Sequence, residues 1–326
     1  MSPHAVNDIA PPSPLLRPVF LHCTWRTAST FLFAQFRKDS RNRCFQEPLH
    51  EFMASLGLDN VGAFNSDSMA GLMRHPVLDR PYFDEYRLVV DPRTNRIPNT
   101  CDQQAVHRFF GMPLECTNLY LESLLAAARS EGRRPVLQFC RTYGRLAWLT
   151  SHFDARHVFS FRDPRDQWAS CYSFNFDYFL PLFCAIAAQR PAAHRRLLDC
   201  RLSRPLPRAT HFTGLLRDST IHKLLSRACK FARTLSASDL YRVFYSEWLF
   251  ALAAGRSYCD EVVDMNRLSE DSSYRERIAE SWQTPLDGCR VPRYERRPLS
   301  NSELADIEAE TKLAFGLAPM ERARAC

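Results

Sequence analysis

The feature that most limits the fold of this chain is a repeated order of short apolar segments, polar turns and amphipathic helices. The apolar, branched or aromatic segments are candidates for buried strands, and the segments after them carry apolar residues at helical spacing. The strand candidates are 18–23, 135–140 and 156–161, and the helices after them are 31–37, 145–153 and 166–174. Strands that alternate with helices predict an α/β fold whose central parallel sheet has helices on both faces.

The rest of the chain predicts further elements around this sheet. We expect a helix at 118–129, a late strand at 261–265, and helices at 271–282 and 301–315. The last helix has the pattern of a capping box, with Ser300 as N-cap and Glu303 three residues later, and Gly316 follows its end. We expect one domain over 18–316 with a helical insertion near 175–254, between flexible tails at 1–17 and 317–326.

Composition favours a soluble globular protein in the cytoplasm. The chain has 326 residues, 45% hydrophobic residues and a net charge of +7. We see no secretion signal at the N-terminus, and no apolar run reaches the roughly 20 residues of a membrane span. The 12 cysteines form no C-x-x-C pair, which favours reduced thiols and argues against a zinc site. We therefore expect no metal, no integral membrane segment and no nucleic-acid partner.

Glycine and lysine are scarce where common nucleotide-binding loops need them. The chain has ten glycines, and none precedes Gly57, so a G-x-G-x-x-G loop cannot follow the first strand. No Gly-Lys dipeptide occurs, which excludes a standard phosphate-binding loop of the G-x-x-x-x-G-K-[ST] type. These absences disfavour NAD-binding and ATP-binding interpretations.

A polar segment, Thr24–Thr30, instead connects the first predicted strand to its helix. Small and hydroxylated residues at such a turn let backbone N–H groups approach an anion, and the positive end of the helix dipole adds to the attraction. Thr27, Ser29 and Thr30 supply hydroxyl groups, and Arg26 supplies a fixed charge. An ordinary helix N-cap with a surface arginine explains this segment equally well when it is considered alone.

A second segment, Phe161–Phe174, follows the third predicted strand. Arg162 stands at the end of the strand, and Ser170 lies eight residues later in the following helix. Both side chains are placed to hold one phosphate at the carboxyl edge of a parallel sheet, where such folds bind ligands. The segment alone is also compatible with a plain helix start, and the pair of segments is more specific than either one.

Together these segments resemble the nucleotide-binding motifs of sulfotransferases that use 3′-phosphoadenosine-5′-phosphosulfate (PAPS). Trp25-Arg-Thr-Ala-Ser-Thr-Phe-Leu32 is similar to the 5′-phosphosulfate loop, and Phe161-Arg-Asp-Pro-Arg-Asp-Gln-Trp-Ala-Ser170 is similar to the 3′-phosphate motif. Cys44-Phe-Gln-Glu-Pro-Leu-His50 resembles a segment of Golgi-type carbohydrate sulfotransferases. The resemblance implies a phosphate-binding-loop-like sulfotransferase fold, with PAPS as co-substrate and 3′-phosphoadenosine-5′-phosphate (PAP) as product.

The resemblance also assigns roles to individual residues. It implies that PAPS is bound by the loop residues and by the later pair, namely Arg26, Thr27, Ala28, Ser29, Thr30, Arg162 and Ser170. Ala28 stands where the family usually has glycine, which implies a backbone conformation that a Cβ tolerates. The glycine-rich nucleotide segment near the C-terminus of cytosolic members is not evident here.

For catalysis, the resemblance implies that Arg26 stabilises negative charge on the reacting oxygens and that Glu47 takes the proton of the acceptor hydroxyl. We expect burial to raise the pKa of Glu47 toward neutrality. His50 is the second candidate for this base, although a structural role is the simpler explanation for it. Arg141 and Arg145 follow a buried strand, and either a place near the cofactor or a surface ion pair explains them.

Other function classes remain open on the sequence alone. The acceptor is a carbohydrate, lipid, peptide or small molecule with a hydroxyl group, and the Glu-Pro-Leu resemblance favours a carbohydrate. A kinase or other nucleotide-binding protein of related fold would need a loop lysine and a metal-binding acid. A non-catalytic protein that binds PAP or another anion would keep the fold without the chemistry.

Overall fold

The computed structural model describes residues 17–63, 78–100, 109–110, 115–173, 176–208, 221–291 and 298–316. Of the predicted tails, only Arg17 lies within these residues. The strands are β1 (Val19–His22), β2 (Asn42–Gln46), β3 (Arg134–Phe139), β4 (Arg156–Phe161) and β5 (Glu261–Asp264). The α-helices are α1 (Ser29–Lys38), α3 (Glu115–Ser130), α4 (Leu146–His152), α5 (Pro164–Ser173), α6 (Phe176–Ala187), α7 (Ala192–Asp199), α9 (Ile221–Ala232), α10 (Ala237–Tyr258), α11 (Met265–Glu270), α12 (Ser272–Trp282) and α13 (Asn301–Ala314). Short 3₁₀ helices are η2 (Glu51–Ser55), η3 (Asp84–Leu88) and η5 (Tyr143–Arg145).

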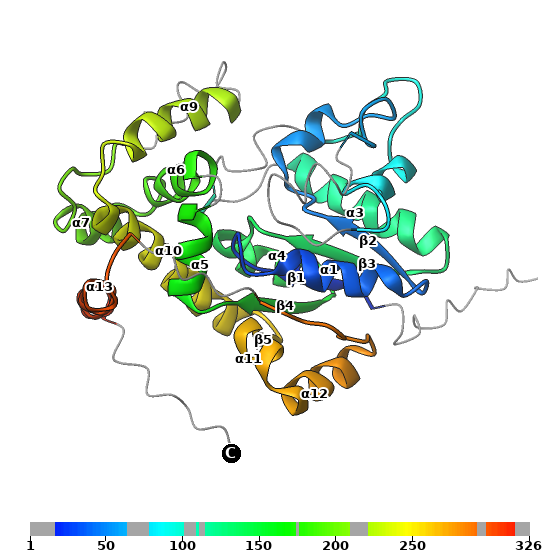
Figure 1. Ribbon diagram of the computed structural model, residues 1–326. Helices are drawn as coiled ribbons and strands as arrows, with labels where there is room; N and C mark the ends of the chain where they lie inside the picture. The colour runs from blue at the N-terminus through cyan, green and yellow to red at the C-terminus, as the bar shows by residue number, and fades with distance from the viewer. Residues whose placement is uncertain are drawn as a thin grey trace, which may run out of the picture.

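The five strands form one parallel sheet in the order β2-β3-β1-β4-β5 (Figure 1). β1 lies in the middle, with His22 paired to Phe139 of β3 on one side and to Phe159 of β4 on the other. The chain first fills one side of β1 with β2 and β3 and then the other side with β4 and β5. The change of direction occurs between β1 and β4, and in open parallel sheets such a switch point is where ligands bind.

The sheet confirms the α/β fold class and the predicted strands at 18–23, 135–140, 156–161 and 261–265. The predicted capping box is also present, because the Ser300 side chain accepts from the backbone of Glu303 and the Glu303 side chain accepts from the backbone of Ser300. The sequence analysis missed β2. Its residues, Asn42-Arg-Cys-Phe-Gln46, are mostly polar and were not recognised as a strand, although all but Arg43 are buried.

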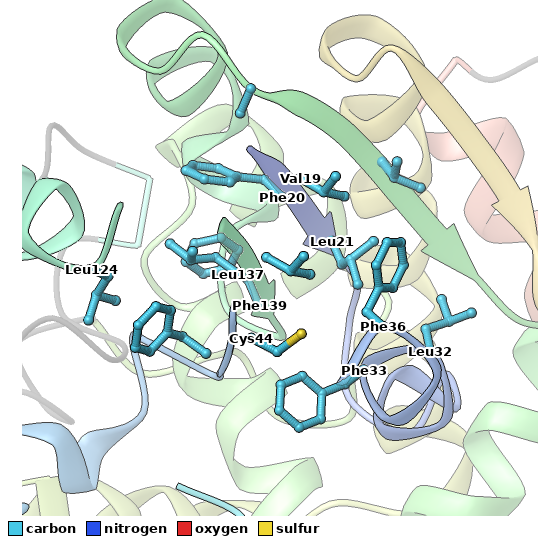
Figure 2. Close-up of a cluster of buried hydrophobic side chains, with 14 of the residues drawn as sticks. Val19, Phe20, Leu21, Leu32, Phe33, Phe36, Cys44, Leu124, Leu137 and Phe139 are labelled. Atoms are coloured by element: carbon cyan, nitrogen blue, oxygen red, sulfur yellow. The ribbon is translucent and has the colours of Figure 1, made fainter. Parts of the chain in front are cut away.

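A large apolar cluster surrounds the strands and includes side chains of both α1 and α3. α1 packs against β2 and β3, and α3 packs against the same two strands. Figure 2 shows side chains of α1 pointing toward those of the strands, with Leu124 of α3 across the strands from them. The members labelled there are Val19, Phe20, Leu21, Leu32, Phe33, Phe36, Cys44, Leu124, Leu137 and Phe139, each buried in one cluster. This burial is what fixes the position of the loop between β1 and α1.

The described part of the chain between β4 and β5 is helical. α6 packs against α9, α10 and α5, and α10 also packs against β4 and β5. α6, α7 and α9 lie together at one end of the molecule, away from α12 (Figure 1). α6 is the most apolar of these helices, and nine of its 12 residues are buried. None of the helices in the described ranges is both long and apolar enough to cross a membrane.

Candidate functional site

The residues singled out by the sequence lie after the carboxyl ends of four neighbouring strands. The segment Thr24–Thr30 follows β1, Arg162 follows β4, and Glu47 follows β2. Arg141 follows β3 in the same way. Parallel strands end at the same edge of the sheet, so these four segments meet there, on both sides of the switch point.

The loop after β1 holds its backbone in an unusual conformation. Arg26 and Ala28 have φ angles of 66° and 67°, in the left-handed region that glycine prefers. Ala28 is the N-cap of α1 and makes no side-chain cap hydrogen bond. The start of α1 therefore presents its dipole and first-turn backbone without a side-chain cap, as anion sites at helix N-termini require.

The hydroxyl groups of this loop have distinct surroundings. The Thr27 hydroxyl donates to the carbonyl oxygen of Thr24 at 3.0 Å, so it stabilises the turn of the loop itself. The Ser29 Oγ lies 3.6 Å from the Cys140 Sγ, at the end of the neighbouring strand β3. Thr30 is buried in the first turn of α1. Thr27 is therefore left with its backbone N–H as its contribution to a bound anion.

The two sequence motifs, about 140 residues apart, come into direct contact. The Arg26 Nε donates to the Ser170 Oγ at 2.8 Å, and the Arg162 Nη1 donates to the Arg26 carbonyl oxygen at 3.3 Å. Gln167 of α5 also holds the loop, because its amide donates to the Thr24 Oγ1 and to the Trp25 carbonyl oxygen, both at 2.6 Å. The structure thus brings the predicted phosphate ligands together across the switch point, from β1 on one side and β4 on the other.

The start of α5 is built to keep Arg162 at the strand end. The Asp163 carboxylate accepts from the backbone N–H groups of Arg165 and Asp166, which caps the helix. The Trp248 indole of α10 donates to the Arg162 carbonyl oxygen at 3.0 Å. Arg162 and Ser170 are both buried, with 2% and 1% of their surface exposed. These two side chains are therefore positioned by surrounding structure and are not solvated surface groups.

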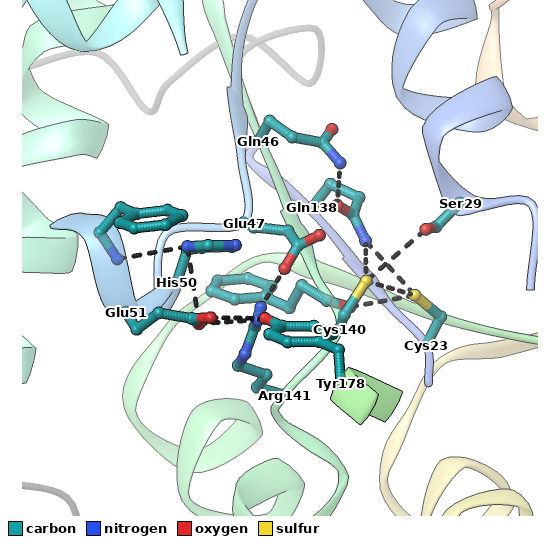
Figure 3. Close-up of polar contacts among 12 residues, drawn as sticks. Cys23, Ser29, Gln46, Glu47, His50, Glu51, Gln138, Cys140, Arg141 and Tyr178 are labelled. Carbon is teal, nitrogen blue, oxygen red and sulfur yellow. Dashed lines mark hydrogen bonds and ion pairs between the residues drawn. The ribbon is translucent and has the colours of Figure 1, made fainter. Parts of the chain in front are cut away.

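Glu47 lies at the same edge of the sheet, after β2, which β3 separates from β1. Its backbone N–H donates to the Gln138 carbonyl oxygen at 2.8 Å, and its φ angle of 44° turns the chain out of the sheet. Its carboxylate accepts from the Arg141 Nη1 (Figure 3) and, at 3.1 Å, from the Tyr82 hydroxyl. With Arg26 and Ala28, it is the third residue near the site with positive φ, and such strain gathers at functional sites.

The expectation of a raised Glu47 pKa was wrong. Burial alone raises the pKa of this carboxyl, but the charge of Arg141, with that of His50, outweighs burial and lowers the pKa below its usual value of 4.5. Glu47 is therefore ionised at neutral pH. Each carboxylate oxygen also has two lone pairs, so the two hydrogen bonds that it accepts leave room for another donor.

His50 makes local contacts at the start of η2. Its Nδ1 accepts from the Phe52 backbone N–H at 3.2 Å and caps η2, and its ring stacks on that of Phe52. Burial lowers the pKa of His50 below 6.5, against the opposing charge of Glu51. A neutral imidazole that accepts at Nδ1 carries its proton on Nε2. In this tautomer His50 is a donor at Nε2, which makes it a poor proton acceptor.

The sequence analysis did not anticipate the group of residues around Arg141. The Arg141 Nη2 donates to the Glu51 Oε2 at 2.9 Å and to the Tyr178 hydroxyl at 2.6 Å, and Tyr178 also donates to Glu51 (Figure 3). Burial raises the pKa of Glu51, but the charge of His50, then that of Arg141 and the hydrogen bond from Tyr178 lower it to about 2. Arg141 is buried, which excludes the surface ion pair considered for it. The sequence signal that could have pointed to this group was an arginine directly after a predicted buried strand.

Acidic residues, histidines and cysteines do not assemble into a metal site in the part of the chain that the structure describes: no group of three or more could hold an ion there.

Comparisons with known proteins give structural neighbours only. No protein-family profile matches the sequence, and no curated protein is significantly similar to it. The crystal structure of the sulfotransferase STF9 from Mycobacterium avium is similar at 13% identity, over 95% of this chain and 70% of that one, with a TM-score of 0.38. The structure of a sulfotransferase from Alicyclobacillus acidocaldarius is similar at 11% identity, over 93% of this chain and 97% of that one, with a TM-score of 0.36.

Proposed function

We propose that this protein is an enzyme that transfers a sulfuryl group from PAPS to a hydroxyl acceptor. The observation that carries the proposal is the contact between Arg26 and Ser170, with Arg162 beside them, at the switch point of the sheet. It joins two segments that each resemble a PAPS-binding motif and that lie far apart in the sequence.

The donor set on this side of the site fits a doubly phosphorylated nucleotide. Two arginines, a serine hydroxyl and the start of α1 without a side-chain cap supply fixed positive charge and several N–H and O–H donors. Arginine binds phosphate and sulfate oxygens with two parallel hydrogen bonds, and helix N-termini bind such anions through backbone N–H groups. In our proposal the loop holds the 5′-phosphosulfate, and Arg162 with Ser170 holds the 3′-phosphate.

The reaction then needs a proton acceptor on the other side of the sulfur. The acceptor oxygen forms a bond to sulfur while the bond between sulfur and the bridging phosphate oxygen breaks, and that electron pair leaves with PAP. The hydroxyl proton passes to the Glu47 carboxylate. Arg26 and the loop stabilise the charge that develops on the leaving phosphate, as positive groups do in phosphoryl transfer.

For the acceptor, we propose only its chemical class, a compound with a hydroxyl group. A hydroxyl group on a carbohydrate, lipid, peptide or small molecule can give the proton that Glu47 takes. The segment that resembles Golgi-type carbohydrate sulfotransferases, Cys44–His50, contains Glu47 and favours a carbohydrate among these.

Calorimetric titration with PAP and with adenosine 5′-monophosphate, without magnesium, tests the nucleotide site. We expect PAP to bind more tightly, because only PAP carries the 3′-phosphate. Arg162→Ala should weaken PAP binding by roughly tenfold or more, since a charge-assisted contact to phosphate is lost, and should affect the monophosphate much less. Ser170→Ala should have a smaller effect in the same direction.

Three outcomes would contradict the proposal. Equal losses for both nucleotides in Arg162→Ala would show that Arg162 does not hold a 3′-phosphate. Binding of ATP with magnesium in preference to PAP would favour a kinase or nucleotide hydrolase. Tight PAP binding without turnover of labelled PAPS across a panel of sugars, phenols, lipids and peptides would favour a non-catalytic binding protein.

A further inference from the structure

Arg141 connects three elements at the acceptor side of the site. It follows β3, and 2% of its surface is exposed. One terminal nitrogen donates to Glu47 after β2, and the other donates to Glu51 of η2 and to Tyr178 of α6 (Figure 3). Its guanidinium also lies over the ring of Trp25, in the loop between β1 and α1, 5.4 Å from the ring centroid. Arg141 therefore contacts both sides of the proposed reaction centre.

Two other buried arginines show what a purely structural ion pair is like in this molecule. Arg37 binds both oxygens of Glu85 through Nε and Nη2, at 2.6 Å and 2.7 Å. Arg190 binds Glu247 in the same two-pronged way, at 2.5 Å and 3.0 Å. In both cases the positive and negative charges balance. Arg190 pairs with Glu247. Around Arg37, Asp79 lies 4.0 Å from Arg37 and a second arginine, Arg80, lies 3.8 Å from Glu85. Each of the two arginines binds its glutamate through two nitrogens, the geometry of a closed pair.

Arg141 differs from these pairs in both charge and geometry. One positive charge faces two carboxylates, Glu47 and Glu51, so the group has an excess of negative charge at the sheet edge. The guanidinium gives one nitrogen to each carboxylate, and its Nε has no hydrogen-bond partner among the described residues. Burying such a bridge costs more free energy than burying a closed pair. We therefore infer that the bridge sets the orientation and charge of the two carboxylates.

We propose that Arg141 is a positioning residue for the sulfuryl transfer: its hydrogen bonds orient the Glu47 carboxylate and connect Glu47 to α6 through Glu51 and Tyr178. This inference rests on the proposed role of Glu47 as the proton acceptor. It adds a residue to the reaction that the sequence motifs do not contain.

The groups around Glu47 decide what removal of Arg141 does. Glu47 faces Arg141 from β3, Glu51 and His50 from the segment around η2, and the Tyr82 hydroxyl. Arg141 and His50 favour the ionised form, whereas burial and Glu51 favour the protonated form. Without Arg141, His50 is left to oppose burial and Glu51, so Glu47 holds its proton more tightly.

NMR titration of protein carrying ¹³C-labelled glutamate carboxyls tests this inference without any nucleotide. The Glu47 signal is assigned by its absence in Glu47→Gln. In the wild type it should titrate below pH 4.5. In Arg141→Gln we expect its proton affinity to rise about tenfold or more, the equivalent of one pKa unit. In Arg141→Lys, which keeps the charge, the proton affinity should return toward that of the wild type.

Glu51→Gln keeps the inference testable if Arg141→Gln does not fold. It removes the competing carboxylate and leaves the charge of Arg141 to Glu47, so the proton affinity of Glu47 should fall. An unchanged Glu47 titration in folded Arg141→Gln, or a rise in Glu51→Gln, overturns the inference. The proposed function fails separately: wild-type protein that titrates as expected but does not bind PAP contradicts sulfuryl transfer and leaves the role of Arg141 toward Glu47 intact.

Discussion

The two sides of the proposed site are built in opposite ways. On the nucleotide side, Arg26, Arg162 and Ser170 belong to two continuous segments that each run from a strand end into the next helix. Their charges are all positive or neutral, and the start of α1 adds its dipole. On the acceptor side, Glu47, Glu51 and Arg141 form a buried network of opposite charges.

This difference shows which parts of such a site a short motif can specify. A loop at a helix start is determined by neighbouring residues, so its sequence is informative by itself. A buried charge network is determined by residues 90 or more positions apart, as for Arg141 with Glu51 and Glu47. The acceptor side is therefore the part on which acid, mutation and substrate identity should act most strongly, and the following predictions test that contrast.

Acid should act on the acceptor side through Glu51, with the largest effect that we expect. The pKa of Glu51 is lowered from 4.5 to about 2. A carboxyl with a lowered pKa stabilises the fold above its unfolded-state value, and this contribution is lost as the pH falls from about 4.5 toward 2. The loss should be about 2 kcal/mol by about pH 3 and about 3 kcal/mol when it is complete.

Urea unfolding at a series of pH values measures this contribution against a matched variant. Glu51→Gln has no carboxyl to protonate, so its stability should fall less steeply than that of the wild type below about pH 4.5. Burial lowers the pKa of His22 in both proteins alike. Glu51→Gln removes the charge that opposes the lowered pKa of His50, so the slopes of the two curves are compared below pH 4.5, where Glu51 titrates. Parallel curves for the two proteins below pH 4.5 would mean that Glu51 is not held ionised by the network.

Glu47→Gln should separate the two sides in a single protein. The change keeps the shape of the side chain but removes the proton acceptor, so turnover of PAPS with an accepted hydroxyl compound should fall about a hundredfold or more. PAP affinity should change little, because Glu47 follows β2, whereas the proposed nucleotide contacts follow β1 and β4. His50→Ala is the control and should reduce turnover less. If His50→Ala abolishes turnover and Glu47→Gln does not, the two roles must be exchanged.

The fold was predictable from the sequence where apolar strands alternate with helices. β1, β3 and β4 are short apolar segments that are buried, and periodicity finds such segments. β2 escaped because its strand carries Asn42, Arg43 and Gln46, whose side chains find partners only in the folded protein. Gln46, for example, donates to Gln138 on β3 and to Tyr82. Such partners are distant in sequence, and no local pattern reveals them.

The candidate site was predictable to the same extent and for the same reason. The motifs placed Arg26, Arg162 and Ser170, and the structure brings all three together. Glu47 was singled out, but its environment was not foreseen, because the charge of Arg141 is 94 positions away. Burial alone predicted a raised pKa for Glu47, and the ion pair reversed the sign. Electrostatic environments are properties of the assembled sheet edge and cannot be obtained from a segment.

The smallest predicted effect concerns the loop on the nucleotide side. Ala28 has φ 67° and ψ 25°, a conformation that costs a residue with a Cβ about 1–2 kcal/mol. Glycine adopts it without this cost but loses about 0.5–1 kcal/mol more through its greater freedom in the unfolded chain. Ala28→Gly should therefore leave stability unchanged or raise it by about 1 kcal/mol, and PAP affinity should stay within about twofold because the backbone keeps its course.

Ala28→Val is the matched control for this prediction. A β-branched side chain is strongly disfavoured at positive φ, so we expect Ala28→Val to destabilise the protein by more than about 1 kcal/mol and to weaken PAP binding together with stability. Thermal unfolding and PAP calorimetry on the three proteins measure both effects. If glycine destabilises the loop as much as valine does, the left-handed conformation is not what the loop needs to hold an anion. The contrast between a locally determined nucleotide side and a network-determined acceptor side would then lose its simplest support.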